Sequence, residues 1–556
     1  MAKHMLGSAL LAQTLHDQGV RTVYGVPGIP ITSVAEALIA KGVNYIAFRN
    51  EQSASYAASV HAYINDQFSI GVLLTTGGPG FVHSLAGIVN ARENLWPLLV
   101  IVGTCRNSHK STSCFQDCRH DLFLQNDQFV HFRRLCSEDT HDISGVIAHL
   151  IQQTKSSIGH SKIISILEVS SKWLEMTLEY LPAESCLFSA QETAFNGKDM
   201  IQNALNDIKK AQRPLIVFGK GACLGRLDEL ALELVETTGV PFLLMPMAKG
   251  LIREDHPLCM SAARTKALAD ATLLILIGAR ANWMLPVDRM LTNSQLQILR
   301  IDIQSKDAAL NKMESDNIRS IIGDCREVIG ALIQEMESKF EYPEWIATLQ
   351  TAKEANVQRV LSLSIDESLP LGYHAVYKTL SKYIIEDTTV VAEGSNTMDI
   401  ARVMLPTYRP RYRLDAGTFA AMGIGMSYAI AAALTRPNEP ILYVAGDSAF
   451  GFSLAELETA ARYGLSNLTV LVMNNSGVYS GVTKEEFAAK CRETPIPRHK
   501  PTALTPNTRY DKLAEMLPEM AQGFLVETLD DLNHALQSKS PILISVINVL
   551  IRTANQ

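Results

Sequence analysis

Short apolar segments that end in glycine alternate with segments of helical periodicity along most of the chain. They include VRTVYGVPG, SIGVLLTTGGPG, PLLVIVGT, RPLIVFGKGA, ATLLILIGAR and LQILRIDIQ. Short strands that are apolar throughout are typical of parallel sheets with helices on both faces. We therefore predict an α/β protein built from doubly wound parallel sheets.

Two polar stretches divide this pattern into three groups. The stretch YLPAESCLFSAQETAFNGKDM follows the first group, and a charged helical stretch that begins MESKFEYPEWIATL precedes the third, which starts near Leu369. A chain of 556 residues is too long for one hydrophobic core, which agrees with several domains. We predict three domains of similar size, at residues 1–185, 190–345 and 365–556.

Composition narrows the classes of partner. The chain is 47% hydrophobic and 19% charged, with a net charge of −7 and no run of Lys or Arg, so we expect neither nucleic acid nor a membrane as partner. Its first twenty residues predict an amphipathic helix rather than a signal peptide, which favours a cytoplasmic location. Nine cysteines without a CxxC pair predict reduced thiols. Cys114, Cys118 and His120 lie close in sequence, but without a second ligand pair they indicate chance rather than a metal site.

The segment from Val444 to Gly481 places polar residues after two apolar strands. PILYVAGDS stops at Gly446, a helical pattern follows, and LTVLVMNN forms the second strand. In such a βαβ unit both strand ends lie at one edge of the sheet, so Asp447 and the pair Asn474 and Asn475 should emerge side by side. Their oxygens, with a carbonyl of the next turn, suit Mg²⁺ with diphosphate oxygens as its other ligands.

The residues around this aspartate fit an anionic ligand. Gly446 permits close backbone approach, and Ser448 and Ala449 open a helix whose N–H groups can bind anionic oxygens. The alternative is a turn Asp and a turn Asn without a ligand, because an isolated Gly-Asp-Ser is common in loops.

A Gly-Asp, a helix and paired asparagines together resemble the thiamine diphosphate-dependent enzymes. The resemblance implies that Asp447, Asn475 and the Gly477 carbonyl hold Mg²⁺, with Asn474 as the alternative because the segment is one residue longer than usual. It also implies a pyrimidine-binding domain, a central domain similar to a nucleotide-binding fold and a diphosphate-binding domain. The stretches AEGSNTMDIAR and DAGTFAAMGIGMSYAI would line the cofactor through Ser395, Asn396, Thr397, Ala420 and Met422. Met422 would support the bent cofactor; the alternative is a core methionine.

The cofactor needs a carboxylic acid at its aminopyrimidine ring. Glu51, at the junction between the strand YIAF and a helix rich in small residues, is the candidate. Taken alone, Glu51 would be a first-turn acid that interacts with the helix dipole.

Further segments, among them FRNEQSASYAA, TTGGPGFVHSLAG and LIGARANWML, resemble 2-hydroxyacyl-CoA lyases and oxalyl-CoA decarboxylases. The resemblance implies formyl-CoA as a product, with an aldehyde as the second product of the lyase and carbon dioxide as that of the decarboxylase. His83 and Gln116 match the lyase pattern, whereas MGIGMSYAI leans toward the decarboxylase, and we favour the lyase. Gln116 and Tyr479 would donate hydrogen bonds to the developing oxyanion; the alternatives are a core histidine at position 83 and a packing role for Tyr479.

The resemblance extends to further ligands. Lys220, Arg280 and Asp302 occupy places where decarboxylases bind ADP, although a vestigial site is as plausible, and Arg402 matches an arginine that contacts CoA phosphates, with a surface ion pair as the alternative. The family continues past the last strand with a segment that folds over CoA, whereas this sequence stops at PILISVINVLIRTANQ. A CoA-free 2-oxo acid, as in acetolactate synthase, and a non-catalytic relative therefore stay open. The resemblance also implies a homodimer or homotetramer.

Overall fold

The computed structural model describes residues 3–65, 69–105, 114–116, 118, 120, 130–156, 163–182, 197–286, 296–304, 317–493 and 496–553. The chain folds into two compact units, and each is described by itself. The first comprises Met1–Gln191, Met426–Thr435 and Ser453–Tyr463, and the second comprises Glu192–Gly425, Arg436–Phe452 and Gly464–Gln556.

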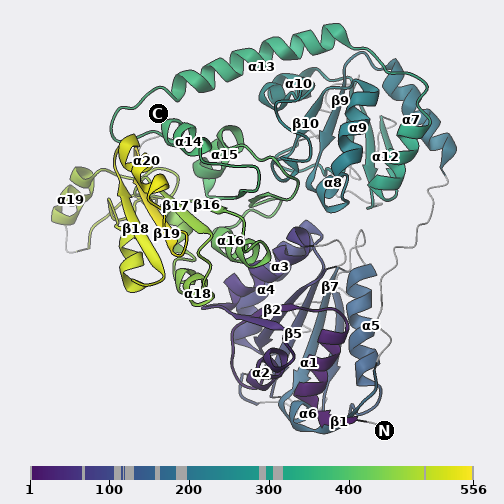
Figure 1. Ribbon diagram of the computed structural model, residues 1–556, viewed down its shortest axis with the longest axis vertical. Coiled ribbons are helices and arrows are strands. Elements are labelled where there is room, and N and C mark those ends of the chain that lie inside the picture. Colours follow the sequence, from purple (N-terminus) through teal and green to yellow (C-terminus); the bar gives the residue numbers. More distant parts are fainter. Residues whose placement is uncertain are drawn as a thin grey trace. The chain divides into compact units, whose positions relative to one another are not determined.

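The first unit contains a six-stranded parallel sheet in the order β3-β2-β4-β5-β7-β6, with helices packed against it (Figure 1). Its strands are β2 (Thr22–Gly25), β3 (Asn44–Ala47), β4 (Gly71–Thr76), β5 (Leu98–Thr104), β6 (Val130–Leu135) and β7 (Ile164–Ser170). Its helices are α1 (Gly7–Asp17), α2 (Thr32–Ala40), α3 (Glu51–Ile64), α4 (Pro79–Asn94), α5 (Ile143–Ser156), α6 (Ser171–Glu175) and α18 (Glu456–Arg462).

The apolar pattern explains the core of this sheet. Every residue of β5 is buried, as expected for a central parallel strand covered on both faces. Helices α3 and α4 pack closely because their facing residues are small: a Cβ on Gly87 of α4 would lie 2.1 Å from the Ser55 hydroxyl of α3.

The N-terminal prediction needs a correction. Residues Lys3–Leu6 form β1, which pairs antiparallel with β8 (Thr177–Tyr180), and the helix begins only at Gly7. Backbone pairing with β8 stabilises the extended conformation of these four residues, so the helical pattern does not extend to the start of the chain.

The segment Ser453–Tyr463 belongs to the first unit through specific contacts. The Tyr463 hydroxyl accepts a hydrogen bond from the Ala47 N–H at 2.7 Å and donates to the Tyr45 carbonyl at 3.0 Å. The Glu456 carboxylate accepts from the Arg49 N–H. The single helix expected between the strands of the Val444–Gly481 segment is therefore two helices, α17 (Asp447–Gly451) in the second unit and α18 in the first.

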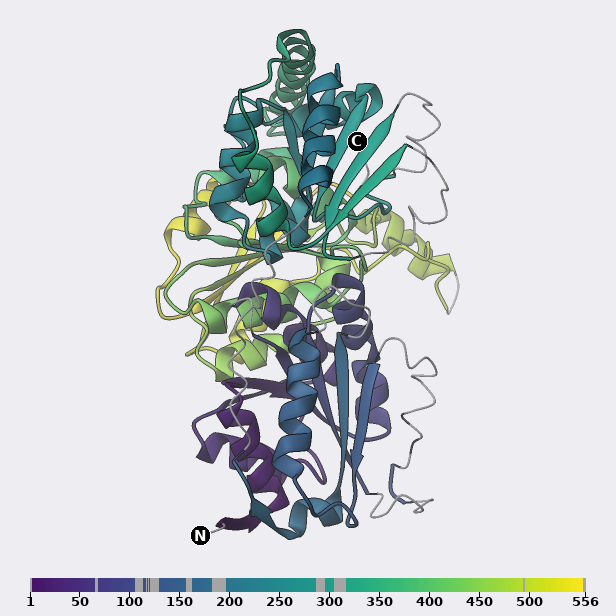
Figure 2. The same ribbon diagram turned by 90° about the vertical axis from the view of Figure 1, so that its right-hand side faces the viewer.

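The second unit contains two parallel sheets. One has the order β10-β9-β11-β12-β13 and the other the order β15-β14-β16-β17-β19-β18. The first of these sheets, shown in teal in Figure 2, comprises β9 (Pro214–Phe218), β10 (Phe242–Leu244), β11 (Leu273–Ile277), β12 (Gln297–Asp302) and β13 (Ile318–Ile322). The second comprises β14 (Thr389–Glu393), β15 (Arg413–Asp415), β16 (Ile441–Gly446), β17 (Leu468–Asn474), β18 (Ala521–Val526) and β19 (Ile544–Leu550).

The helices around the sheet β10-β9-β11-β12-β13 are α7 (Lys198–Lys210), α8 (Lys220–Leu224), α9 (Asp228–Thr238), α10 (Arg264–Asp270) and α12 (Cys325–Gln334). The charged stretch after this sheet forms the long helix α13 (Pro343–Leu363), as predicted. The other helices of this unit are α14 (Tyr373–Ser381), α15 (Ser395–Met404), α19 (Lys484–Glu493) and α20 (Leu529–Gln537), with 3-10 turns at Pro246–Ala248, Ser261–Ala263 and Tyr510–Met516. Helix α16 (Ile424–Thr435) belongs from Met426 onward to the first unit.

Three parallel sheets with helices confirm the predicted fold class, whereas the predicted domain boundaries stay predictions. Among the described residues, no helix has both the length and the apolar character that crossing a membrane requires.

The expectation of reduced thiols is wrong for two of the nine cysteines. Cys105, just after β5, and Cys114 form a disulfide, with their Cα atoms 5.9 Å apart. The chain returns to the end of β5 at Cys114, which brings the two Cα atoms within the usual span of a disulfide. The other described cysteines lie outside this disulfide: Cys118, Cys136, Cys223, Cys259, Cys325 and Cys491.

Candidate active site

A cavity of ≈ 540 Å³ opens beyond the carboxyl ends of β14, β16 and β17, which are neighbours in the second sheet of the second unit. Parallel strands of α/β proteins place ligand-binding residues at this edge. The cavity brings together many of the predicted site residues: Ser395, Asn396, Thr397, Ala420, Met422, Gly446, Asp447, Ser448, Ala449, Asn475, Gly477 and Tyr479. Its wall also includes residues that the sequence did not single out: Trp283, Tyr373, Gly394, Met398, Asp399, Ala416, Ala421 and Val478.

Asp447 is the charged centre of one wall. Its side chain is buried, with Oδ1 accepting a hydrogen bond from the Ser448 N–H at 2.9 Å and Oδ2 accepting from the Gly477 N–H at 3.0 Å. Burial raises the pKa of Asp447 to about 6 and outweighs these N–H groups, which lower it. A cation in the cavity would favour the ionised carboxylate.

The two asparagines after β17 point to different places. The Asn475 amide donates to the Tyr479 carbonyl at 3.1 Å, and its oxygen accepts from the Gly477 N–H at 3.2 Å, so it lies at the cavity. Asn474 instead donates to the carbonyl of Thr508 at 2.9 Å and to Asn548 at 3.2 Å, and it is not among the cavity residues. The geometry thus favours Asn475 as the ligand candidate.

Backbone shape around the cavity requires small residues. A Cβ on Gly477 would lie 2.5 Å from the Gly481 Cα, and one on Gly446 would lie 3.2 Å from the Thr397 hydroxyl. Gly394 has a φ of +97°, which side chains other than hydrogen rarely allow. Oxygen donors from Asp447 and Asn475 beside closely approaching backbone fit a hard cation and a diphosphate.

Glu393, the last residue of β14, was missed by the sequence reasoning. Its side chain is fully buried and accepts hydrogen bonds from the N–H groups of Gly423, Ile424 and Gly425, and from the Tyr443 hydroxyl at 2.5 Å. It thereby joins the end of β14 to the turn that follows the cavity residue Met422. Burial raises the pKa of Glu393 to about 7, although these four hydrogen bonds lower it.

Glu51 and His83 come together in the first unit. Glu51 begins α3 after Asn50, which caps that helix by accepting from the Ser53 N–H. His83 lies in α4, and its Nδ1 is 3.2 Å from Glu51 Oε2. The Glu51 side chain is 14% exposed and that of His83 is 63% exposed, so the pair presents one accessible imidazole beside a largely covered carboxylate.

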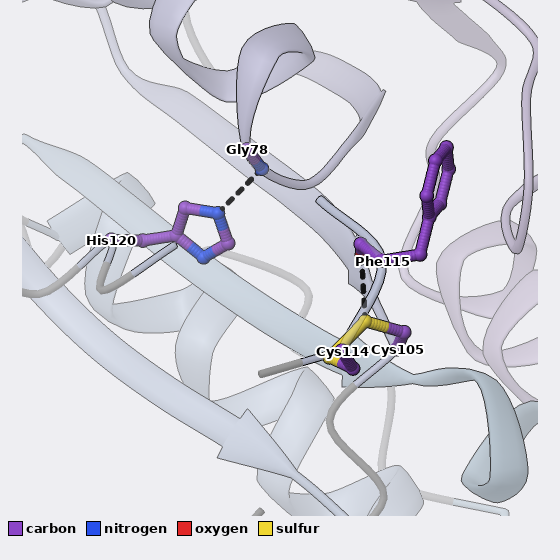
Figure 3. The surroundings of a disulfide bond; sticks show 5 residues. All are labelled: Gly78, Cys105, Cys114, Phe115 and His120. Atoms are coloured by element: carbon purple, nitrogen blue, oxygen red, sulfur yellow. Dashed lines mark hydrogen bonds between the residues drawn. A yellow bond between two sulfur atoms is a disulfide. The ribbon is translucent and has the colours of Figure 1, made fainter. Parts of the chain in front are cut away.

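Gln116 lies in a short described segment next to the N-terminus of α4. It is exposed, with a φ of +53°, and a Cβ on Gly78 would lie 2.5 Å from its carbonyl oxygen. The Cys105–Cys114 disulfide anchors this segment at one side (Figure 3). His120 anchors it at the other, where its Nε2 accepts from the Gly78 N–H at 3.0 Å.

The residues predicted for ADP are only partly brought together. Lys220 and Arg280 line a cavity of ≈ 40 Å³, and the Lys220 ammonium donates to the Thr418 hydroxyl at 3.3 Å. Asp302 is buried at the end of β12 and is not among the residues of that cavity. A space of this size, among the described residues, holds a few water molecules.

Arg402 is engaged by acidic residues. Its guanidinium donates to Asp415 at 3.0 Å and to Asp399 at 2.7 Å, and it lies 5.5 Å from the ring centre of Trp283. Its side chain is 14% exposed. Arg402 itself does not line the larger cavity, although Trp283 and Asp399 do. Arg402 thus forms ion pairs, but the pair with Asp415 is buried rather than at the surface.

Among the described residues, no three His, Cys, Asp or Glu side chains form a cluster that could hold a metal ion. The candidate cation ligands around Asp447 are one carboxylate, one side-chain amide oxygen and one backbone carbonyl. Such a set contains only one side chain of the His, Cys, Asp and Glu types.

Known protein families match all three sheets. The N-terminal thiamine pyrophosphate-binding domain model matches residues 5–124, the central domain model of the same enzymes matches 201–332, and their C-terminal thiamine pyrophosphate-binding domain model matches 392–546. The chain belongs to the thiamine pyrophosphate enzyme family, and its binding domains indicate thiamine diphosphate as the cofactor.

Relatives are similar over nearly the whole chain. A 2-hydroxyacyl-CoA lyase of Arabidopsis thaliana is 34% identical, over 98% of this chain and 95% of that protein. The 2-hydroxyacyl-CoA lyase 1 of Homo sapiens is 33% identical, over 98% and 94%. An oxalyl-CoA decarboxylase of Escherichia coli is 32% identical, over 97% and 94%. Relatives of both predicted branches are therefore present at comparable identity.

Proposed function

We propose that the protein is a thiamine diphosphate-dependent carbon–carbon lyase of the 2-hydroxyacyl-CoA lyase type. It would cleave a 2-hydroxyacyl-CoA to formyl-CoA and an aldehyde, or catalyse the reverse. The observation that carries the proposal is the grouping of Asp447, Asn475 and Gly477 in the wall of the ≈ 540 Å³ cavity. The names of the relatives supply the substrate class.

Asp447, Asn475 and Gly477 would hold Mg²⁺ through the carboxylate, the amide oxygen and the backbone carbonyl. Oxygen atoms of the cofactor diphosphate would complete the coordination, since Mg²⁺ binds carboxylates together with phosphates. The Ser448 and Gly477 N–H groups hold both carboxylate oxygens of Asp447 in place, so the ligand is oriented before the ion arrives.

When bound, thiamine diphosphate supplies an electron sink for the carbanion that C–C cleavage leaves. The chain contributes a carboxylic acid at Glu51, which would hold and release a proton at its carboxyl oxygen. His83 orients that carboxyl group through the 3.2 Å contact to Oε2. Met422 in the cavity wall would offer an apolar support.

Hydrogen-bond donors for the reacting carbonyl are proposed at Tyr479 and Gln116. The Tyr479 backbone is held by two amides, because its carbonyl accepts from Asn475 at 3.1 Å and from Asn396 at 3.3 Å. Its side chain is 56% exposed and lines the cavity. With the backbone of Tyr479 held at the cavity, its phenol would donate to an oxyanion there.

The experiment that tests this function is product analysis after three separate incubations, with a 2-hydroxyacyl-CoA, oxalyl-CoA or pyruvate, each with thiamine diphosphate and Mg²⁺. We expect formyl-CoA and an aldehyde from the first substrate. Formyl-CoA from oxalyl-CoA alone would support the decarboxylase. Acetolactate from pyruvate alone would support CoA-free chemistry. Lack of cofactor binding would support a non-catalytic relative.

We also propose a homodimer or homotetramer, as the family resemblance implies. Light scattering on the purified protein at several concentrations tests it: a mass near 61 kDa, that of one chain, would contradict an oligomer.

A further inference from the structure

A polar chain of contacts runs through the first unit to the N-terminus of α4. The Arg134 guanidinium in β6 donates to both carboxylate oxygens of Glu168 in β7, at 2.7 and 3.2 Å. Glu168 Oε2 lies 2.9 Å from His120 Nδ1. The Gly78 N–H donates to His120 Nε2 at 3.0 Å, and Figure 3 draws this second contact. The His120 and Glu168 side chains are 1% and 0% exposed.

These contacts settle the protonation of His120. A backbone N–H can only donate, so Nε2 must be unprotonated, and the ring proton is on Nδ1, where it donates to Glu168. Burial raises the pKa of Glu168, but hydrogen bonds from His120 and Arg134 outweigh it and hold the pKa below its ordinary value. A neutral imidazole thus bridges an ionised carboxylate and a backbone N–H.

Gly78 is the residue that precedes α4, so this bond acts on the start of the helix. No side chain caps α4 at Gly78, whose carbonyl accepts from the Val82 N–H at 3.0 Å in the first turn. The His120 ring also lies against neighbouring residues: it packs edge-on against Phe81 at 4.9 Å between ring centres, and a Cβ on Gly77 would lie 3.3 Å from its Cε1. His120 therefore fixes where α4 begins.

The start of α4 is also the part of the helix that meets Glu51. A Cβ on Gly80 would lie 3.3 Å from Glu51 Oε1, and His83 Nδ1 is 3.2 Å from Glu51 Oε2. Both oxygens of the carboxyl group thus face residues of the first five positions of α4. A shift of Gly78 would move these residues relative to Glu51.

We propose that His120 is a positioning residue for the Glu51–His83 pair, acting through the Gly78 N–H and the start of α4, with Glu168 fixing its tautomer. The proposal rests on the proposed function, in which Glu51 is the proton-holding acid. His120 would not touch the substrate. It keeps α4 in the register that places His83 against the carboxyl group.

Two substitutions separate the two bonds of the ring. In His120→Asn the amide replaces Nδ1 and can still donate to Glu168, but nothing accepts from the Gly78 N–H. In His120→Gln the longer side chain places an oxygen near the former Nε2, where it can accept from Gly78. The two variants have similar polarity and differ in whether the Gly78 N–H has an acceptor. His120→Gln is therefore the matched control.

The first readout is hydrogen–deuterium exchange of peptides that cover residues 77–84, measured on the full-length holoenzyme. It needs no substrate. We expect faster exchange in His120→Asn than in the wild type, and near wild-type exchange in His120→Gln. Unchanged exchange in the Asn variant would overturn the assignment of the Gly78 contact.

The second readout is kcat and KM with the substrate that the wild type uses. We expect kcat to fall about 10-fold to 100-fold in His120→Asn, as for a small misplacement of a catalytic group, with KM and cofactor affinity nearly unchanged and with partial recovery in His120→Gln. Faster exchange with unchanged kcat would overturn the positioning role. An equal loss of kcat in both variants would also overturn it, since it would report a structural role alone.

Failure of the proposed function is distinguishable from failure of this inference. A wild type that binds the cofactor but cleaves none of the substrates would contradict the proposed function. It would also contradict the positioning role in catalysis, even if the exchange of residues 77–84 changes as expected. If His120→Asn does not fold, Glu168→Leu replaces it: this side chain cannot accept from Nδ1 and no longer fixes the tautomer of the ring, so the same rise in exchange and fall in kcat are expected. Wild-type behaviour of that variant would contradict the proposal.

Discussion

The carboxylate of Asp447 accepts a hydrogen bond from the backbone N–H of Gly477 at 3.0 Å, which joins the first residue of α17, directly after β16, to the segment that follows β17. Neighbouring parallel strands bring two segments thirty residues apart in sequence into contact at one edge of the sheet. The cavity wall around this contact is where we place Mg²⁺ and the cofactor diphosphate.

Asn475 and Asn474 should behave differently when truncated. We expect Asn475→Ala to weaken Mg²⁺-dependent binding of thiamine diphosphate by about tenfold or more, the size of effect usual for groups around a metal. Asn474→Ala should leave binding unchanged but lower stability, because it removes the hydrogen bonds to Thr508 and Asn548. Calorimetric titration with cofactor and Mg²⁺ measures both. Equal losses in the two variants would contradict the choice of Asn475.

Glu51→Gln should retain the cofactor and lose turnover. The amide keeps the size of the side chain but cannot exchange a proton, and a general acid or base usually contributes about 100-fold to 10,000-fold. The measurement is kcat, alongside cofactor content by mass spectrometry. Normal turnover in Glu51→Gln would remove Glu51 from the mechanism.

Glu393 should make stability depend on pH. Its pKa is about 7 in the folded protein against 4.5 for an ordinary Glu, so between these values the folded state holds a proton that the unfolded state has lost. Stability should therefore fall as pH rises from 4.5 to 7, by about 3 kcal/mol at 1.4 kcal/mol per pH unit. Urea unfolding measured across this pH range should show that the free energy of unfolding falls less steeply with pH in Glu393→Gln than in the wild type. Parallel curves for the two proteins would contradict it.

The Cys105–Cys114 disulfide should add stability that reductant removes. A loop with a sequence separation of 9 is expected to contribute about 2 to 3 kcal/mol by restricting the unfolded chain. The wild type should lose this amount on addition of reductant, and the Cys105→Ser/Cys114→Ser double variant should not respond. Cys118→Ser is the control, as Cys118 is not part of the disulfide. A wild type insensitive to reductant would contradict the prediction.

Patterns along the chain predicted those parts of the site that depend on strand ends. Asp447 and Asn475 each follow an apolar strand, and parallel pairing of β16 and β17 is enough to bring them to one cavity. Alternation of apolar strands and helices likewise predicted the three sheets. Both inferences rely on periodicity, which a single sequence displays directly.

Features that depend on the path of the chain in space were not predictable in this way. Glu393 lies in the stretch AEGSN, and the neighbouring residues in sequence do not indicate that three N–H groups at the start of α16 donate to its carboxylate. Cys105 and Cys114 pair because the chain returns to the end of β5. The break between α17 and α18 reflects contacts of Tyr463 with Tyr45 and Ala47, more than four hundred residues earlier.

The most direct test of the proposed lyase is the stoichiometry of its products. Purified protein with thiamine diphosphate and Mg²⁺ is incubated with a 2-hydroxyacyl-CoA, and formyl-CoA and the aldehyde are quantified over time by chromatography, with Glu51→Gln as the control. We predict that the two products appear in equal amounts and that the variant forms neither at a comparable rate. Absence of formyl-CoA while the cofactor is bound would contradict the assignment as a 2-hydroxyacyl-CoA lyase.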